Sequence, residues 1–152
     1  MSEHNIYLQV PDYLAEWITH KYGNPVQMVK DSPEMRVLNE MLVKKPQSIN
    51  LEQSPGHNLV IPIPHFKGKD PQYYNYMHES GKSALIESFS SLFKKSLYCE
   101  ISALQNVEIK RSTVIYAFME KNGISANHWD TVAQIYHRIK QKYFKEKDIK
   151  FC

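Results

Sequence analysis

The pattern of apolar and polar residues predicts a mixed α+β chain. Residues Asn5–Val10 alternate between the two types, as in a half-buried strand. Pro11 ends this strand, and Asp12 is placed to cap a helix that Gly23 should end. The apolar stripe of that helix comprises Tyr13, Leu14, Trp17 and Ile18.

A second strand and a second helix are expected next. Pro25–Lys30 is a short strand candidate. Ser32 is placed as a helix cap, with Pro33 at the first helical position. The buried face of this helix is expected to contain Met35, Leu38, Met41 and Leu42.

The middle of the chain predicts a loop, a strand and a turn. Gln47–Asn58 is polar and predicts an exposed loop, and Lys67–Pro71 predicts a turn. Leu59–Pro64 is apolar and predicts a strand. Pro62 and Pro64 lack N–H groups on the same side, so this strand is expected at a sheet edge.

From Tyr73 onward the pattern predicts helices. Ser83–Leu97, Arg111–Lys121 and Trp129–Phe144 each carry apolar residues at helical spacing, and Asn122-Gly123 separates the last two. The predicted fold is therefore α+β, with a small two- or three-stranded sheet followed by a three-helix, helix-turn-helix-like unit. We expect an α+β part over residues 1–72 and a helical part over 73–152. They should pack as one body, because about 70 residues alone form only a marginal core.

Composition excludes several classes of protein. The apolar fraction is 42% and the charged fraction 23%, close to globular averages, and no apolar run is long enough to span a bilayer. We therefore expect no membrane association. The chain has two cysteines, Cys99 and Cys152, and its first residues lack a secretory pattern. These features predict a cytoplasmic protein.

Positive charge is concentrated near the C-terminus. The net charge is +3; residues 1–106 contribute −1, and residues 107–152 contribute +4. On the last predicted helix, the face opposite the apolar stripe presents Gln134, His137, Arg138, Gln141 and Lys145. These residue types can reach phosphates and base edges. A solvated helix face is the alternative interpretation.

Arg111–Lys145 has the order helix, turn, helix. Gly123 permits a positive φ in the turn, and Ile124 can pack between the helices. In a DNA-binding unit of this kind the last helix enters the major groove. The main expected DNA contacts are Arg138, Gln141, Lys142 and Lys145, with Gln134 and His137 nearest the base edges. A purely structural helical hairpin is the alternative.

Catalytic motifs are largely missing from the sequence. Ser80–Ser83 imitates the end of a P-loop, but Tyr76 stands where that motif needs glycine, so we expect a serine there to cap a helix instead. Cys99 is expected to be a small buried residue. The seven histidines show no metal-ligand spacing. We therefore expect no enzyme, cofactor, metal or small-molecule substrate.

Tyrosines 73, 74 and 76 follow Lys67 and Lys69 closely. Such a cluster can stack bases while lysines hold a phosphate backbone. We favour the simpler expectation that the tyrosines pack the edge strand onto the helices.

Three segments carry a resemblance to other proteins: I-Y-L-Q-V-P-D-Y-L-A-E-W-I (Ile6–Ile18), V-I-P-I-P-H-F-K-G-K-D-P-Q-Y-Y-N-Y-M (Val60–Met77) and the region Val114–Lys140. The chain resembles small uncharacterised bacterial proteins that are often carried on mobile or phage-derived elements. The resemblance implies a helix-turn-helix-like C-terminus and a DNA-related role, and it supplies no catalytic residues.

Two functional hypotheses follow. The first is a non-enzymatic DNA-binding protein that uses the basic C-terminal helix. The second is a protein–protein interaction module or homodimer that uses the edge strand over Leu59–Ile63 or the tyrosine-rich surface.

Overall fold

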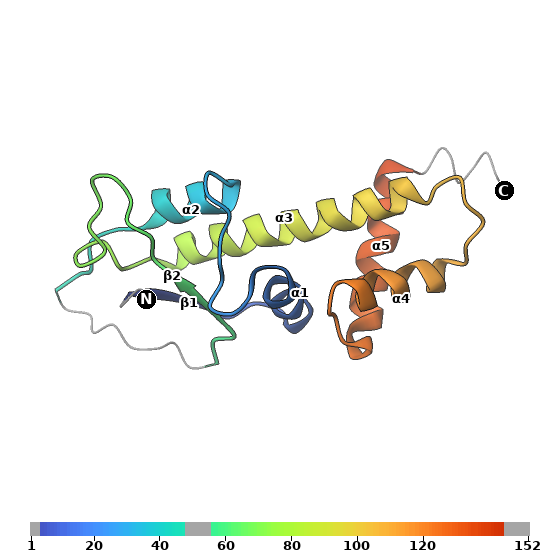
Figure 1. Ribbon diagram of the computed structural model, residues 1–152, viewed down its shortest axis with the longest axis horizontal. Helices are drawn as coiled ribbons and strands as arrows, with labels where there is room; N and C mark the ends of the chain where they lie inside the picture. Colours follow the sequence, from blue (N-terminus) through green and yellow to red (C-terminus); the bar gives the residue numbers. More distant parts are fainter. Residues whose placement is uncertain (1–3, 48–55, 145–152) are drawn as a thin grey trace. The chain divides into compact units, whose positions relative to one another are not determined.

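A computed structural model describes residues 4–47 and 56–144 of the chain (Figure 1). The predicted α+β class is confirmed. The elements in chain order are β1 (Asn5–Leu8), α1 (Asp12–Tyr22), α2 (Pro33–Met41), β2 (Leu59–Pro62), α3 (Glu79–Ala103), α4 (Arg111–Lys121), a 3-10 turn η1 (Ala126–His128) and α5 (Trp129–Tyr143). The chain divides into two compact units within α3, between Ser90 and Ser91.

The sheet of the first unit is the antiparallel pair β1–β2, in which Ile6 faces Ile61 and Leu8 faces Leu59. These four side chains are buried, so the alternating pattern is confirmed. Strand β1 ends at Leu8, short of the predicted Val10. The Val10 backbone pairs instead with the Asn58 side chain, whose Oδ1 accepts from Val10 N at 3.0 Å and whose Nδ2 donates to Val10 O at 2.8 Å.

The predicted strand over Pro25–Lys30 is wrong, because this segment forms a turn and irregular chain. Val26 is buried, and its N–H donates to the Val60 carbonyl at 2.8 Å. The Val60 N–H is taken by the Asn24 side chain at 3.1 Å, and Pro62 has no N–H to offer. A third strand cannot build a ladder along an edge with so few free groups.

Local signals at the ends of α1 and α2 are largely confirmed. Ser32 Oγ accepts a hydrogen bond from Met35 N at 3.2 Å, and Pro33 occupies the first turn of α2. Gly23 ends α1 with a φ of 83°. The predicted cap Asp12 is wrong: α1 already includes Asp12, and Pro11 stands at its N-cap without a side-chain hydrogen bond.

The prediction of helix from Tyr73 is wrong for residues 73–78. Tyr76 forms an antiparallel bridge with Val43, in which Val43 N donates to Tyr76 O at 2.9 Å and Tyr76 N donates to Val43 O at 3.2 Å. This non-local pairing occupies the backbone groups that a helix would need. Helix α3 therefore begins at Glu79.

Ser80 and Ser83 are not helix caps, because both lie inside α3. Gly81 between them is buried where α3 approaches α2. A Cβ built on Gly81 would lie 2.8 Å from Met77 Cγ and 3.0 Å from Met41 Cβ. The glycine in this P-loop-like sequence therefore serves close helix packing.

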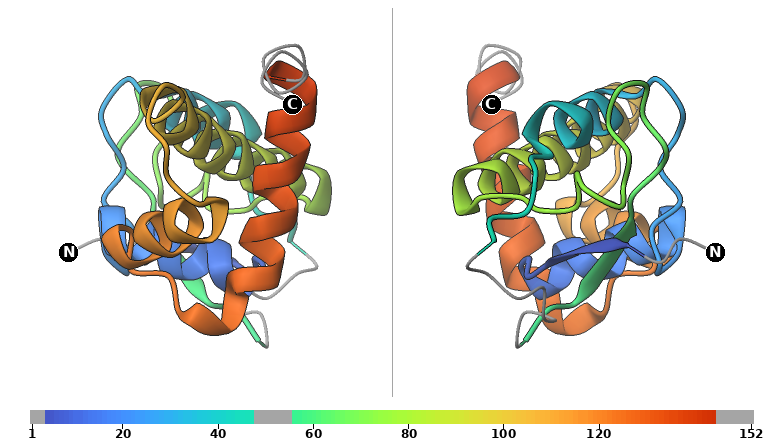
Figure 2. Two further views of the ribbon diagram at one scale, coloured as in Figure 1. Left: turned by 90° about the vertical axis from the view of Figure 1, so that its right-hand side faces the viewer. Right: turned by 90° about the vertical axis from the view of Figure 1, so that its left-hand side faces the viewer.

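The second unit contains the C-terminal half of α3, α4 and α5, which agrees with the predicted three-helix unit (Figure 2). Phe93 of α3 and Phe118 of α4 meet edge-to-face, with ring centroids 5.8 Å apart. Gly123 has a φ of 69°, and Ile124 is buried, as expected. The 3-10 turn was not predicted. Ser125 caps it by accepting from Asn127 N at 3.3 Å.

Two parts of the sequence predictions lie outside the described residues. One is most of the loop over Gln47–Asn58, of which residues 48–55 are not described. The other is the segment from Lys145 to Cys152.

The Phe93–Phe118 contact generates a stability prediction. Phe118→Ala should lower the free energy of unfolding by about 3–5 kcal/mol, because it removes a large, fully buried ring. Tyr116→Ala on the same helix removes a ring that is 51% exposed and should cost at most about 1 kcal/mol. Urea unfolding followed by circular dichroism measures both. Equal losses would show that the Phe118 ring contributes little to the core.

Candidate nucleic-acid interface

The structure places most of the predicted DNA-contacting residues on accessible parts of α5. Gln134, Arg138, Gln141 and Lys142 are exposed. His137 is half-buried, and its ring meets Tyr136 edge-on at 5.8 Å. Lys145 lies outside the described residues.

A groove of about 500 Å³ lies between α3 and α5 in the second unit. Arg138 and Lys142 line it from α5. The other α5 residues of the lining are Ile135, Ile139 and Tyr143, and α3 contributes Ser91, Lys94, Lys95 and Tyr98. Arg138 and Lys142 therefore share this lining with Lys94 and Lys95 of α3, which were not among the predicted contacts.

The missed residues have a signal in the sequence. Lys94 and Tyr98 are four residues apart, so they share one face of α3. Lys94 and Lys95 follow directly after the buried Phe93, which places them off the buried stripe. What the sequence does not give is which other helix that face meets.

The charged residues in the described lining of the groove are all positive. Lys94, Lys95, Arg138 and Lys142 are exposed, and no carboxylate of the described residues lines the groove. Within residues 4–47 and 56–144, none of these four cations forms an ion pair. The nearby Glu100 is paired instead with Lys121, at 3.7 Å. The groove thus offers positive charge that no acidic side chain of the described chain offsets.

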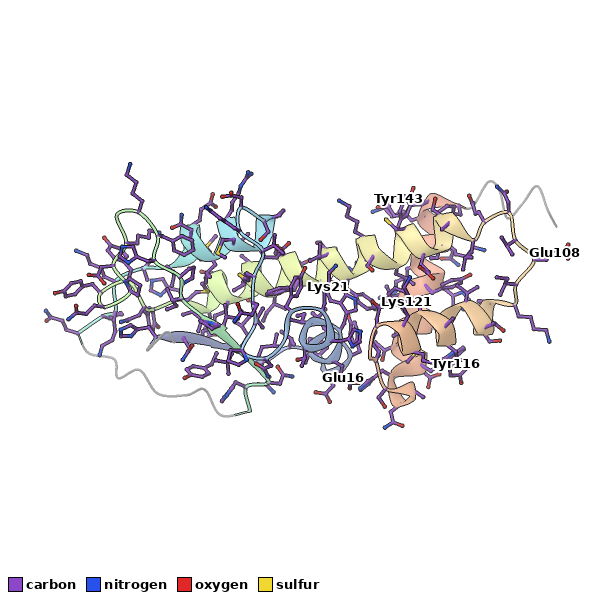
Figure 3. All side chains as sticks on the ribbon, viewed as in Figure 1. Glu16, Lys21, Glu108, Tyr116, Lys121 and Tyr143 are labelled. Atoms are coloured by element: carbon purple, nitrogen blue, oxygen red, sulfur yellow. The ribbon has the colours of Figure 1, made fainter. Side chains whose placement is uncertain are left out.

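Two aromatic side chains, Tyr98 and Tyr143, also line the groove. Tyr98 of α3 and Tyr143 of α5 meet edge-to-face with centroids 5.2 Å apart, and Tyr98 also contacts Phe144 at 5.3 Å. Tyr143 is labelled in Figure 3, beside the C-terminal part of α3. The Lys142 ammonium lies 5.2 Å from the Tyr143 ring centroid, a cation–π distance. This contact orders one groove cation without neutralising it.

The connection between α4 and α5 departs from a short helix-turn-helix turn. The seven residues 122–128 separate Lys121 from Trp129, and they include the 3-10 turn. The turn of a DNA-binding helix-turn-helix is about three or four residues long. The connection is thus longer than that of a helix-turn-helix that inserts its last helix into a major groove. The exposed cations of the groove come from both α5 and α3.

Other chemistry in the described part of the chain is sparse. Cys99 is exposed on α3, so the expectation that it is buried is wrong. It falls two residues from the buried Leu97, and about 200° of helical turn carries it to the solvent side. Residues 4–47 and 56–144 hold no group of three potential metal ligands, and none of their helices could cross a bilayer.

No protein-family model, curated protein or solved structure matches this chain.

The exposure of Cys99 can be checked chemically. In a Cys152→Ser background, Cys99 should react with a maleimide in the folded protein at a rate within about tenfold of the unfolded chain, because accessibility controls thiol reactivity. The control is Ala133→Cys in a chain without Cys99, since Ala133 is buried. That thiol should react only as fast as the fold opens. Equally slow reactions would place Cys99 in the core.

Proposed function

We propose that the second unit binds DNA, without catalysis, through the cationic groove between α3 and α5. The observation that carries the proposal is the group of four exposed cations from two helices, with no carboxylate among the described residues of the lining. Phosphates favour such a site because each contact releases condensed counterions from the nucleic acid.

The groove residues divide by the part of DNA they suit. Lys94, Lys95, Arg138 and Lys142 suit phosphate oxygens, and the Tyr98 and Tyr143 hydroxyls can add hydrogen bonds to the same backbone. Exposed Gln134 and Gln141 on α5 carry both a donor and an acceptor. They are the residues on this helix best suited to base edges. Of the predicted contacts the proposal keeps Gln134, Arg138, Gln141 and Lys142, and it adds Lys94 and Lys95. It does not use His137, which is half-buried, or Lys145, which lies outside the described residues.

The rival hypothesis of an interaction module loses part of its basis. Along the outer side of β2, the Val60 N–H is already bonded to Asn24, and Pro62 and Pro64 have no N–H. A partner strand needs such donors to extend a sheet. The DNA hypothesis is preferred because the four groove cations are exposed and form no ion pair within the described residues. A cytoplasmic location and an origin on mobile elements remain predictions that fit this function.

The proposal predicts a salt-dependent affinity that depends on the groove cations. Arg138→Glu/Lys142→Glu should weaken binding to duplex DNA at least tenfold, because two contacts are replaced by repulsion. The slope of log affinity against log salt should be about −3 to −4 for the unchanged protein, and its magnitude should decrease by about two in the variant. Fluorescence anisotropy with a labelled duplex over a salt series measures both quantities.

A matched control variant distinguishes the effect of the groove residues from the effect of a lower net charge. Lys110→Glu/Arg111→Glu makes the same charge change at exposed positions of the same unit, outside the groove lining. It should retain most of the affinity. Circular dichroism checks that both variants are folded. An equal loss in the two variants would mean that overall charge, and not this groove, governs binding.

A further inference from the structure

The first unit contains a polar cavity of about 970 Å³. None of its lining residues belongs to the groove of the second unit. Its lining includes three lysines, two tyrosines and one largely buried amide: Lys44, Lys45, Lys69, Tyr73, Tyr74 and Asn75. Asp70 is the one carboxylate among the described residues of this lining.

Backbone pairing holds this set together. The Val43–Tyr76 bridge continues at Lys45, whose N–H donates to the Tyr73 carbonyl at 3.3 Å. The Asp70 carbonyl accepts from Tyr73 N at 2.9 Å and from Tyr74 N at 2.8 Å. Asp70 Oδ1 also accepts from Gln72 N at 2.9 Å. Lysines and tyrosines that are about 30 residues apart in sequence are thus fixed beside one another.

The three lysines are not equivalent. Lys69 Nζ donates to the carbonyls of Asn39 and Leu42 at the end of α2, so its charge serves that helix terminus. Lys44 is exposed, and its Nζ lies 5.6 Å from the Tyr74 ring centroid. Lys45 is also exposed, and no described carboxylate pairs with it. Lys44 and Lys45 are therefore the cations available to an anion.

Asn75 adds a buried acceptor to the lining. Its side-chain Nδ2 donates to the carbonyls of Pro71 at 2.9 Å and Gln72 at 3.1 Å, which fixes the orientation of the amide. The residue is 6% exposed, and its Oδ1 has no hydrogen-bond partner within the described chain. The Oδ1 atom has less than 1 Å² of accessible surface, so the amide holds the wall of the cavity in place and is not itself open to a ligand.

We propose that this cavity binds a nucleotide, independently of the DNA-binding groove. The phosphate would contact Lys44 and Lys45, and the base would stack on Tyr73, whose ring is 59% exposed. A simple anion would use the lysines and leave the exposed ring unused. The combination of the two lysines and the ring therefore favours a nucleotide over phosphate alone.

The test uses the full chain and a fluorescently labelled ATP, with binding followed by anisotropy. Lys44→Ala/Lys45→Ala should raise the dissociation constant at least tenfold, and Tyr73→Ala at least about fivefold. The matched control is Lys30→Ala/Lys67→Ala, which removes two exposed lysines of the same unit outside the cavity lining. It should change the dissociation constant less than about twofold, as should Tyr116→Ala.

Competition identifies the ligand and separates the two sites. Unlabelled AMP should compete at least tenfold better than inorganic phosphate; equal competition would overturn the proposal. If a single-stranded oligonucleotide competes better than AMP, the natural ligand is a nucleotide within a nucleic-acid strand. If it does not, the ligand is a free nucleotide. Arg138→Glu/Lys142→Glu should leave labelled ATP binding unchanged. Loss of binding in that variant, or no saturation by about millimolar nucleotide, would overturn the proposal.

Discussion

The buried stripe along α3 is the constraint on which the rest of the structure depends. A buried apolar side chain occurs at every fourth position: Leu85, Phe89, Phe93, Leu97 and Ile101. Full burial of each contributes about 1.5–3 kcal/mol, so this face cannot accept charge. The helix supplies core residues to both compact units, since their division falls within it. Its polar residues are consequently confined to the remaining faces.

This confinement determines which faces of α3 and α5 carry the positive charges of the second unit. Lys94 and Lys95 follow Phe93 by about 100° and 200° of helical turn, so both are directed away from the core. On α5, burial of Ile135 and Ile139 confines Arg138 and Lys142 in the same way. Like charges that share one lining repel each other, and a bound polyanion would relieve this repulsion. Binding of a polyanion at the groove would therefore lower the electrostatic free energy of the protein.

Local sequence signals predicted the elements better than their surroundings. The Ser32 cap, the Gly23 and Gly123 turns and the apolar stripes each depend on residues within one or two turns. The structure confirms the cap, the turns and most of the stripes, while Tyr13, Met35 and Met41 are only half-buried. Some local signals failed too, since Asp12 is not a cap and Cys99 is exposed. The failed strand and helix predictions involve distant partners. Tyr76 pairs with Val43 instead of starting a helix. The segment after Gly23 does not form a strand, because Pro62 and Pro64 have no N–H with which the edge of β2 could bond to it. For the candidate site, α5 was predicted from its own charge pattern, while the α3 lysines needed the tertiary arrangement.

The interactions that each cation already makes determine whether it can bind an anion. Lys69 is bonded to the carbonyls at the end of α2, and Lys121 is paired with Glu100. To bind a phosphate, either would first have to give up an existing contact, which offsets the gain. Lys94 and Arg138 lie in a lining without carboxylates, so they exchange only water for phosphate. Net charge therefore describes this chain poorly: its +3 is the difference between 19 basic and 16 acidic residues, and it does not say which cations are left without an ion pair to bind a polyanion.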